Sequence, residues 1–344
     1  MDFSVNICDM QTTSTILWVA TAPRIPAMNS SRRSIDLSSG SACTVSLRTV
    51  LLLAVALLSL SATSLAQDAN ITLPVPEIEK MLAAETFSIV SAEISRPKAK
   101  GDITLKADVS FGGQPPIRVK LRKAEPGADS FNNVPRYDMA AYELQKLFLD
   151  PAEYVVPPTA LRFVPLAEFR KYSPDVERTF PGAEQVLAVI QYWLQDIKVV
   201  ADVYDPAVFE SDPVYARHIG QLNILTDIID HADSNVGNFL ISKATPGARV
   251  FSIDHGVAFA SEESDRGKLW FKLRVNRLPA DAVERLRKIT PSMLQDSLGV
   301  LAQWQLKDGT YVPSPKGENL APNQGVRREG AILQMGLKKS EVTK

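Results

Sequence analysis

The sequence contains the stretch His231-Ala-Asp233-Ser-Asn-Val-Gly-Asn238, followed further on by Ser252-Ile-Asp254-His-Gly256. Asp233 and Asn238 are five positions apart, and Asp254 follows Asn238 by sixteen positions. A helix end, a loop, a small hairpin and a second loop would bring these three polar side chains to one point. One carboxylate could then orient a hydroxyl group and take its proton, while the amide and the second carboxylate hold a metal. This division of labour is what phosphoryl transfer requires.

A simpler interpretation is that Asp233 and Asn238 cap turns in a polar loop, as Asx residues often do. We favour the site because two loops at this spacing would otherwise have to coincide. His231 and His255 are both expected to be structural.

The first part of the chain predicts an antiparallel sheet. Residues 102–111 alternate strictly between apolar and polar side chains, a glycine pair follows, and alternation resumes over 117–121. Together with a first strand at 87–94 they predict a three-stranded meander. A helix is expected over 136–149, followed by short extended stretches at 154–156, 161–164 and 186–192.

The second part is more helical. Helices are expected over 213–230, 280–289 and 292–304, and a hairpin is expected from 238–242 and 250–253. Residues 308–344, rich in Pro, Gly, Asn and Lys, predict a disordered tail. The fold class is therefore α+β with two lobes, an N-terminal lobe over 67–194 and a C-terminal lobe over 195–307, and a cleft between them.

The N-terminal segment indicates export. Val50–Leu60 is an apolar run preceded by Arg48 and followed by small residues that end at Ala66. This pattern predicts a signal peptide over 1–66, with Met28 as an alternative start, and a periplasmic or secreted product. An uncleaved anchor is the alternative, although the run is short for a span. No later segment is apolar enough to predict an integral membrane domain after cleavage.

Composition narrows the function. Both cysteines, Cys8 and Cys43, lie in the segment to be removed, so thiol chemistry is not expected in the mature protein. The formal net charge of −1 argues against a nucleic-acid partner bound through a general basic field.

The two loops resemble the catalytic and metal-binding loops of the protein-kinase superfamily, His-x-Asp-x-x-x-x-Asn and Asp-x-Gly. The resemblance implies Asp233 as catalytic base, with Asn238 and Asp254 as ligands of the Mg²⁺ or Mn²⁺ that accompanies ATP. Secretory-pathway kinases of the Golgi casein-kinase type, with their bacterial relatives, are the most similar. Their features are matched by Tyr137-Asp-Met-Ala-Ala-Tyr142, Val156-Pro-Pro158 and Asp254-His-Gly-Val-Ala-Phe259. The likeness covers roughly residues 117–259.

Kinases place a lysine near the end of the third strand, where it contacts the α- and β-phosphates. Lys120 and Lys123 are the candidates. Lys123 is preferred because alternation puts it on the same face as Val119 and Leu121, while Lys120 falls on the polar face.

The following helix should supply an acid to pair with that lysine. Glu143 lies at the edge of the apolar stripe by periodicity. The resemblance favours Asp138, although the family has Glu there and an acid in a first turn also suits the helix dipole.

The remaining nucleotide contacts follow from the same resemblance. The Gly-rich phosphate loop is absent, and Arg96, Lys98 and Lys100 are expected to hold phosphates in its place. The adenine would meet backbone groups near Gln191 to Trp193, with Leu240 beneath it; the alternative is that these are core residues.

Three functions remain open. The first is an exported kinase acting on a hydroxyl of a protein or glycan, the targets that the export signal favours. The second is a small-molecule phosphotransferase similar to aminoglycoside and choline kinases, which share these motifs. The third is a nucleotide-binding pseudokinase, against which the retention of all three metal-site residues argues. A periplasm holds little ATP, so the source of the nucleotide and nucleotidyl transfer as the reaction also stay open.

Overall fold

The computed structural model describes residues 69–84, 86–95, 103–112, 114–131, 133–259 and 274–343. The chain divides into two units, Met1–Thr63 and Ser64–Lys344, and the described residues belong to the second. The predicted signal peptide lies outside them, as do Arg96, Lys98 and Lys100. Among the described helices, none combines the length and the apolar character that crossing a bilayer requires.

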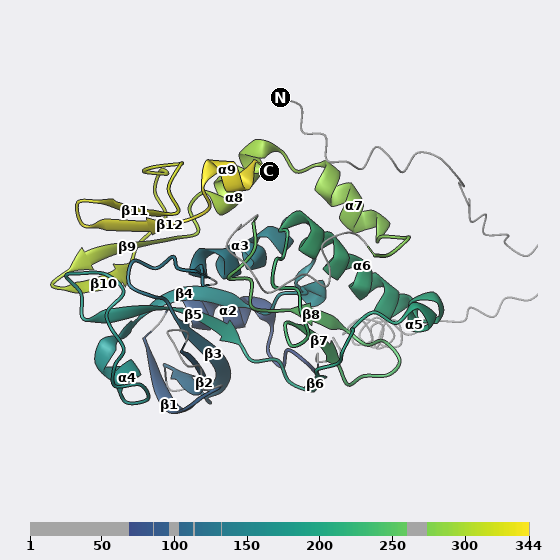
Figure 1. Cartoon of the computed structure of the whole chain (residues 1–344), viewed down its shortest axis with the longest axis horizontal. Coiled ribbons are helices and arrows are strands. Elements are labelled where there is room, and N and C mark those ends of the chain that lie inside the picture. Colours follow the sequence, from purple (N-terminus) through teal and green to yellow (C-terminus); the bar gives the residue numbers. More distant parts are fainter. Residues whose placement is uncertain are drawn as a thin grey trace, which may run out of the picture. The chain divides into compact units, whose positions relative to one another are not determined.

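A five-stranded antiparallel sheet dominates the N-terminal part (Figure 1). Its spatial order is β1-β2-β3-β5-β4, so the predicted meander of β1 to β3 is confirmed. The strands are β1 (Phe87–Ile94), β2 (Thr104–Phe111), β3 (Ile117–Lys123), β4 (Thr159–Pro165) and β5 (Gln185–Tyr192).

The two faces of this sheet have different surroundings. Val119 and Leu121 of β3 belong to an apolar core that also contains Ile78 and Leu82 of helix α2 (Val75–Ala84). Residues of β3 alternate in direction, so Lys120 and Arg122 lie on the opposite face. That opposite face is the one that carries the candidate site.

Helix α3 (Pro135–Gln145) packs against β4 and β5. The helix begins at Pro135, and the N–H groups of a first turn have no partner within a helix. The N–H that proline lacks is therefore not missed there, which explains the start of the helix. It ends at Gln145, before the predicted 149, and the side chain of Gln145 turns to the following loop. Its Nε2 donates to the Val156 carbonyl, and its Oε1 accepts from the N–H groups of Val155 and Val156.

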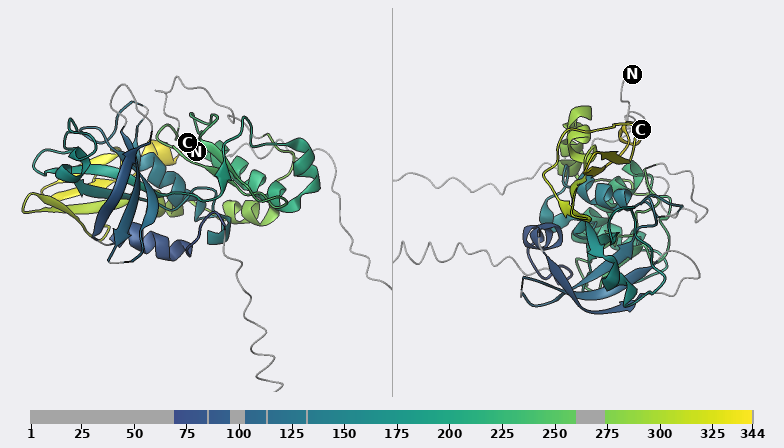
Figure 2. Two further views of the ribbon diagram at one scale, coloured as in Figure 1. Left: turned by 90° about the horizontal axis from the view of Figure 1, so that it is seen from below. Right: turned by 90° about the vertical axis from the view of Figure 1, so that its left-hand side faces the viewer.

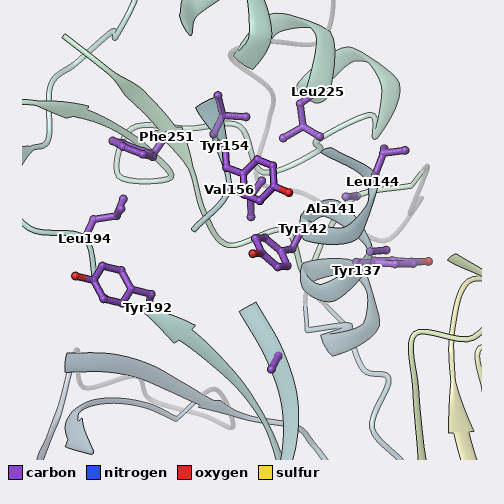
Figure 3. Close-up of a cluster of buried hydrophobic side chains, with 14 of the residues drawn as sticks. Tyr137, Ala141, Tyr142, Leu144, Tyr154, Val156, Tyr192, Leu194, Leu225 and Phe251 are labelled. Carbon is purple, nitrogen blue, oxygen red and sulfur yellow. The ribbon is translucent and has the colours of Figure 1, made fainter. Parts of the chain in front are cut away.

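Apolar side chains fix α3 against the rest of the molecule. Tyr142 points from α3 toward Tyr154 of the loop, and their rings meet edge to face at 5.8 Å (Figure 3). Leu144 of α3 and Leu225 of α6 lie in the same cluster. Burying these side chains ties the helix to both the sheet and the helical part of the chain.

The middle of the chain is helical and carries a small sheet. Helix α6 (Pro213–Ile228) is capped by Asp212, which accepts from the N–H groups of Val214 and Tyr215. The predicted hairpin is confirmed as β7 and β8, joined by β6 into a three-stranded antiparallel sheet. The remaining elements here are η2 (Pro151–Glu153), α4 (Leu166–Arg170), β6 (Ile197–Lys198), α5 (Pro206–Ser211), β7 (Phe239–Ser242) and β8 (Val250–Ser252).

The C-terminal part differs from the prediction. Helix α7 (Ala280–Arg287) is confirmed, but the helix expected over 292–304 ends at Leu298. The residues predicted to be a disordered tail form most of a four-stranded antiparallel sheet of order β10-β9-β12-β11. Its elements, with the flanking helices, are α8 (Pro291–Leu298), β9 (Ala302–Lys307), β10 (Thr310–Pro313), β11 (Val326–Glu329), β12 (Ile332–Met335) and α9 (Lys339–Val342).

A second apolar core explains why this segment is ordered. Phe163 and Leu187, on the site face of β4 and β5, share a buried cluster with Trp304, Tyr311 and Leu333. Phe163 stacks on Tyr311 at 4.7 Å between ring centroids and meets Trp304 edge to face at 5.2 Å. The C-terminal strands, yellow in Figure 2, therefore cover part of the five-stranded sheet. The mixed architecture of helices and antiparallel sheets agrees with the predicted α+β class.

Candidate active site

A cavity of about 320 Å³ collects most of the predicted site residues. Its wall comes from β2, β3 and β5, from the segment after β5, and from the two motif loops around β7 and β8. The predicted residues that line it are Lys120, Gln191, Trp193, Asp233, Asn238, Leu240 and Asp254. A larger depression of about 560 Å³ near Arg170 and Arg178 contains none of the motif residues.

Lys120 is the strand lysine that faces the cavity. Its Nζ donates to Oδ1 of Asp254, and the two side chains are 10% and 34% exposed. Asp254 adopts the left-handed backbone region with φ 61°, which Asp tolerates better than most residues. Because the Asp254 carboxylate already pairs with a cationic side chain in the cavity, it is suited to bind the metal that accompanies a nucleotide.

Lys123, the preferred candidate, does not line the cavity. It lies three positions beyond Lys120 and therefore on the other face of β3, where Val119 and Leu121 enter the apolar core. There its Nζ pairs with Glu125 at 2.8 Å. The alternation was predicted correctly, but the polar face and not the apolar face turns to the cavity.

Arg122 is a site residue that the sequence analysis missed. It lies on the same face as Lys120, lines the cavity and is 4% exposed. Its guanidinium donates to Oδ2 of Asp138, and its Nη1 lies 3.7 Å from Oδ1 of Asp254. Side chains alternate along a strand, so Arg122 is the next residue after Lys120 on the same face, and this spacing could have predicted it.

Asp138 connects the helix to the Asp254 loop. It is 1% exposed, and its Oδ1 accepts the backbone N–H of His255 at 2.9 Å while Oδ2 accepts from Arg122. Burial raises its pKa, and the charges of Arg122 and Lys120 oppose that rise. The helix acid therefore pairs with Arg122, whereas the resemblance had implied a lysine.

Gly256 lets Arg122 take this place. A Cβ at position 256 would lie 2.9 Å from Nη1 and 3.0 Å from Nη2 of Arg122. Contacts this short force a displacement, and Asp138 restricts where the guanidinium can go. The Asp-x-Gly stretch thus has a local steric reason for its glycine.

Asp233 and Asn238 lie at the two ends of the first motif loop. Asp233 is 5% exposed, and its Oδ1 accepts from Nδ2 of Asn235 at 2.8 Å. Nδ2 of Asn238 donates to the Asp233 carbonyl at 2.7 Å. Because the amide nitrogen is committed to that bond, Oδ1 of Asn238 is the atom left for the cavity.

These residues fit a hard divalent cation. Asp254 and Asn238 offer a carboxylate and an amide oxygen, which suit Mg²⁺ and Mn²⁺. Within the described residues no group of three or more His, Cys, Asp or Glu side chains forms a metal cage of its own. Phosphotransferases bind Mg²⁺ through few protein ligands together with water and the phosphates of the nucleotide, and Asp254 with Asn238 is compatible with that pattern.

His231 and His255 lie behind the loops and do not line the cavity. Both are fully buried, and their ring centroids are 4.8 Å apart. Burial lowers the pKa of each imidazole, that of His255 most strongly. Two neutral rings packed in this way support the loops, in keeping with the structural role expected of them.

Glu143 lies away from the cavity. Its carboxylate pairs with Lys146 of the same segment at 2.7 Å, so it does not take the place predicted for the helix acid. Gln191, Trp193 and Leu240, which were predicted to surround the nucleobase, line the cavity.

Comparison with known proteins finds a similarity to solved structures. No family model matches the sequence, and no curated protein matches it significantly. The fold is similar to the crystal structure of the Golgi casein kinase with Mn and ADP bound, at a TM-score of 0.43 and 15% sequence identity. The match covers 77% of this chain and 85% of that one. A likeness of this degree does not assign the chain to a family.

Proposed function

We propose that this protein is an exported kinase that transfers the γ-phosphate of ATP to a hydroxyl group of a protein or glycan. The observation that carries the proposal is the convergence of Lys120, Asp233, Asn238 and Asp254 in one cavity. These residues come from a strand and from two loops more than a hundred positions away. The proposed fold is the two-lobed protein-kinase type, with the cavity as its nucleotide cleft.

Each residue has a distinct proposed role. Asp233, nearly buried and held by Asn235, takes the proton of the attacking hydroxyl. Asn238 and Asp254 would hold Mg²⁺ or Mn²⁺ through their side-chain oxygen atoms, and this metal would supply positive charge to neutralise the transferring phosphate. Lys120, which pairs with Asp254, would contact the phosphates of the nucleotide.

The cavity also favours an active enzyme over a pseudokinase. A protein that only binds nucleotide needs no carboxylate at position 233, since that group acts on the acceptor. Here Asp233 lines the same cavity as the two metal-site residues. The distinction between a macromolecular acceptor and a small one rests on the export signal, which favours a protein or glycan.

The domain proposal changes in one respect. Residues 67–194 and 195–307 remain the proposed lobes, and 1–66 remain the proposed export segment. Residues 308–343 become a structured extension that packs on the first lobe through Tyr311 and Leu333.

Nucleotide binding tests the proposal. ADP with Mn²⁺ should raise the melting temperature of the wild-type protein, because a ligand at 100 times its Kd stabilises by about 2.7 kcal/mol. Asp254→Ala should abolish this shift, and the exposed Asp175→Ala should keep it. An Asp254→Ala protein that keeps the full shift would show that the metal assignment is wrong.

A further inference from the structure

Gln191 occupies a central place in the cavity wall. It lies on β5, opposite Lys120 of β3 on one side and opposite Thr159 of β4 on the other. Its side chain is 3% exposed and lines the cavity. A buried amide at this position must be hydrogen-bonded, and how it is bonded determines what it offers to a ligand.

A short chain of hydrogen bonds fixes the orientation of this amide. Nε2 of Gln191 donates to Oγ1 of Thr159 at 2.9 Å, and that hydroxyl donates to the Pro157 carbonyl at 2.7 Å. A carbonyl can only accept, so the threonine proton is committed to it. The hydroxyl must therefore accept from one N–H of the amide, which leaves Oε1 as the acceptor that Gln191 offers to a ligand.

Three main-chain groups that follow Gln191 are already hydrogen-bonded within the protein. The N–H of Tyr192 donates to the Pro158 carbonyl at 2.8 Å, and the N–H of Trp193 donates to the Arg118 carbonyl at 3.0 Å. The Trp193 carbonyl accepts from Nε2 of Gln195 at 2.9 Å. The N–H groups of Tyr192 and Trp193 and the Trp193 carbonyl, three of the backbone groups expected near the adenine, are thus bonded within the protein itself.

An acceptor and a donor are available along this part of the wall. They are Oε1 of Gln191 and the main-chain N–H of Leu194, for which the described residues provide no acceptor. An acceptor and a donor in this order complement the edge of adenine, whose 6-amino group donates and whose N1 accepts. Guanine presents the reverse, because its 6-oxo group accepts and its N1–H donates.

We propose that the side chain of Gln191, held by Thr159, selects adenine over guanine nucleotides. The inference rests on the nucleotide site proposed above and adds the class of base. A guanine nucleotide would bring its 6-oxo group against Oε1, or would require the amide to turn over. Turning it over would take the Thr159 proton away from the Pro157 carbonyl and leave that buried group unpaired.

The expected selectivity follows from leaving one buried polar group unpaired. That penalty corresponds to about 10- to 100-fold in affinity. It should be visible without turnover, so ADP and GDP with Mn²⁺ are the appropriate probes.

Titration calorimetry of ADP and GDP with the full chain tests the inference. Wild type should bind ADP about 10- to 100-fold more tightly than GDP. Gln191→Leu should weaken ADP and remove most of the preference. Thr159→Val should also narrow the preference by freeing the amide to turn, whereas Thr159→Ser keeps the hydroxyl and should keep the preference.

Gln185 provides a matched control on the same strand. It is also a buried glutamine, but its Oε1 accepts from the Tyr311 N–H outside the cavity. Gln185→Leu should therefore leave the ADP-to-GDP ratio unchanged, even if its melting temperature falls.

The outcomes separate this inference from the proposed function. Equal binding of ADP and GDP by wild type, or an unchanged ratio in Gln191→Leu, would overturn the inference and leave the kinase proposal standing. Failure of wild type to bind either nucleotide would overturn both.

Discussion

Removing Arg122 should destabilise the protein strongly, because the ion pair that it forms is buried at both ends. Arg122 is 4% exposed and Asp138 is 1% exposed. In Arg122→Met the Asp138 carboxylate would keep the backbone N–H of His255 and lose its guanidinium. Breaking a buried pair by removing one partner costs about 3–5 kcal/mol in free energy of unfolding.

Arg118→Met is the matched control. Arg118 also lies on β3 on the same face, but its pair with Asp108 is solvent-exposed, with side chains 43% and 31% accessible. An exposed pair contributes about 0–1 kcal/mol, so the control should change stability little. The comparison separates the loss of an arginine from the loss of a buried partner.

Urea titrations of wild type, Arg122→Met, Asp138→Asn and the double variant measure the effect. The double variant should be more stable than the sum of the single losses predicts, since the neutral amide at position 138 leaves no buried charge without a partner. Burial raises the pKa of Asp138 in the folded protein, so the unfolded chain loses this proton at a lower pH than the folded chain does. The stability loss in Arg122→Met should therefore grow as the pH rises above 3.8, the ordinary pKa of Asp. Losses below about 1 kcal/mol at pH 7 that match Arg118→Met would refute the reasoning.

Three further predictions concern other parts of the described structure. Burial lowers the pKa of His231 and His255 in the folded protein. Below about pH 6.5 these histidines are therefore protonated in the unfolded chain but not in the folded one. Unfolding free energy measured in urea should fall between pH 7 and pH 5.5 by up to about 1.4 kcal/mol per pH unit for each histidine, and a flat profile would contradict it. Glu341→Gln should lower the unfolding free energy by about 1–3 kcal/mol, because Glu341 of α9 accepts a hydrogen bond from Nη2 of Arg136 of α3 at 2.9 Å. Unchanged stability would show that this contact does not stabilise the packing of α9 on α3. Lys120→Met should weaken binding of ADP with Mn²⁺ by about 10- to 100-fold in calorimetry, and wild-type affinity would exclude Lys120 from the phosphate site.

Periodicity predicted much of the N-terminal sheet because each strand has a face that must be buried. It could not predict which face of β3 turns to the cavity. Lys123 was preferred because it shares a face with Val119 and Leu121, yet that face enters the core and the polar face carries Lys120 and Arg122. The choice depends on where α3 and the motif loops pack, which lies beyond local sequence.

The C-terminal sheet was not predicted because the composition of residues 308–344 was interpreted as disorder, and a turn signal at its start was not used. Pro, Gly and Asn suggested disorder after Asp308, although Asp308-Gly309 separates two stretches that can pair as a hairpin. Both residues have positive φ, 49° and 74°, as the tightest hairpin turns require. Trp304 and Tyr311, one on each strand, then gain a partner in Phe163, which no local pattern could reveal.

The central claim is that Asp233 acts on the acceptor while Asp254 and Asn238 hold the metal with the nucleotide. The most direct measurement is transfer of labelled phosphate from ATP with Mg²⁺ or Mn²⁺, to the protein itself and to generic protein and glycan acceptors. Asp233→Asn should keep the melting temperature and the nucleotide affinity of wild type and lose about 10²- to 10⁴-fold in turnover. Transfer at near wild-type rate by Asp233→Asn would contradict the claim.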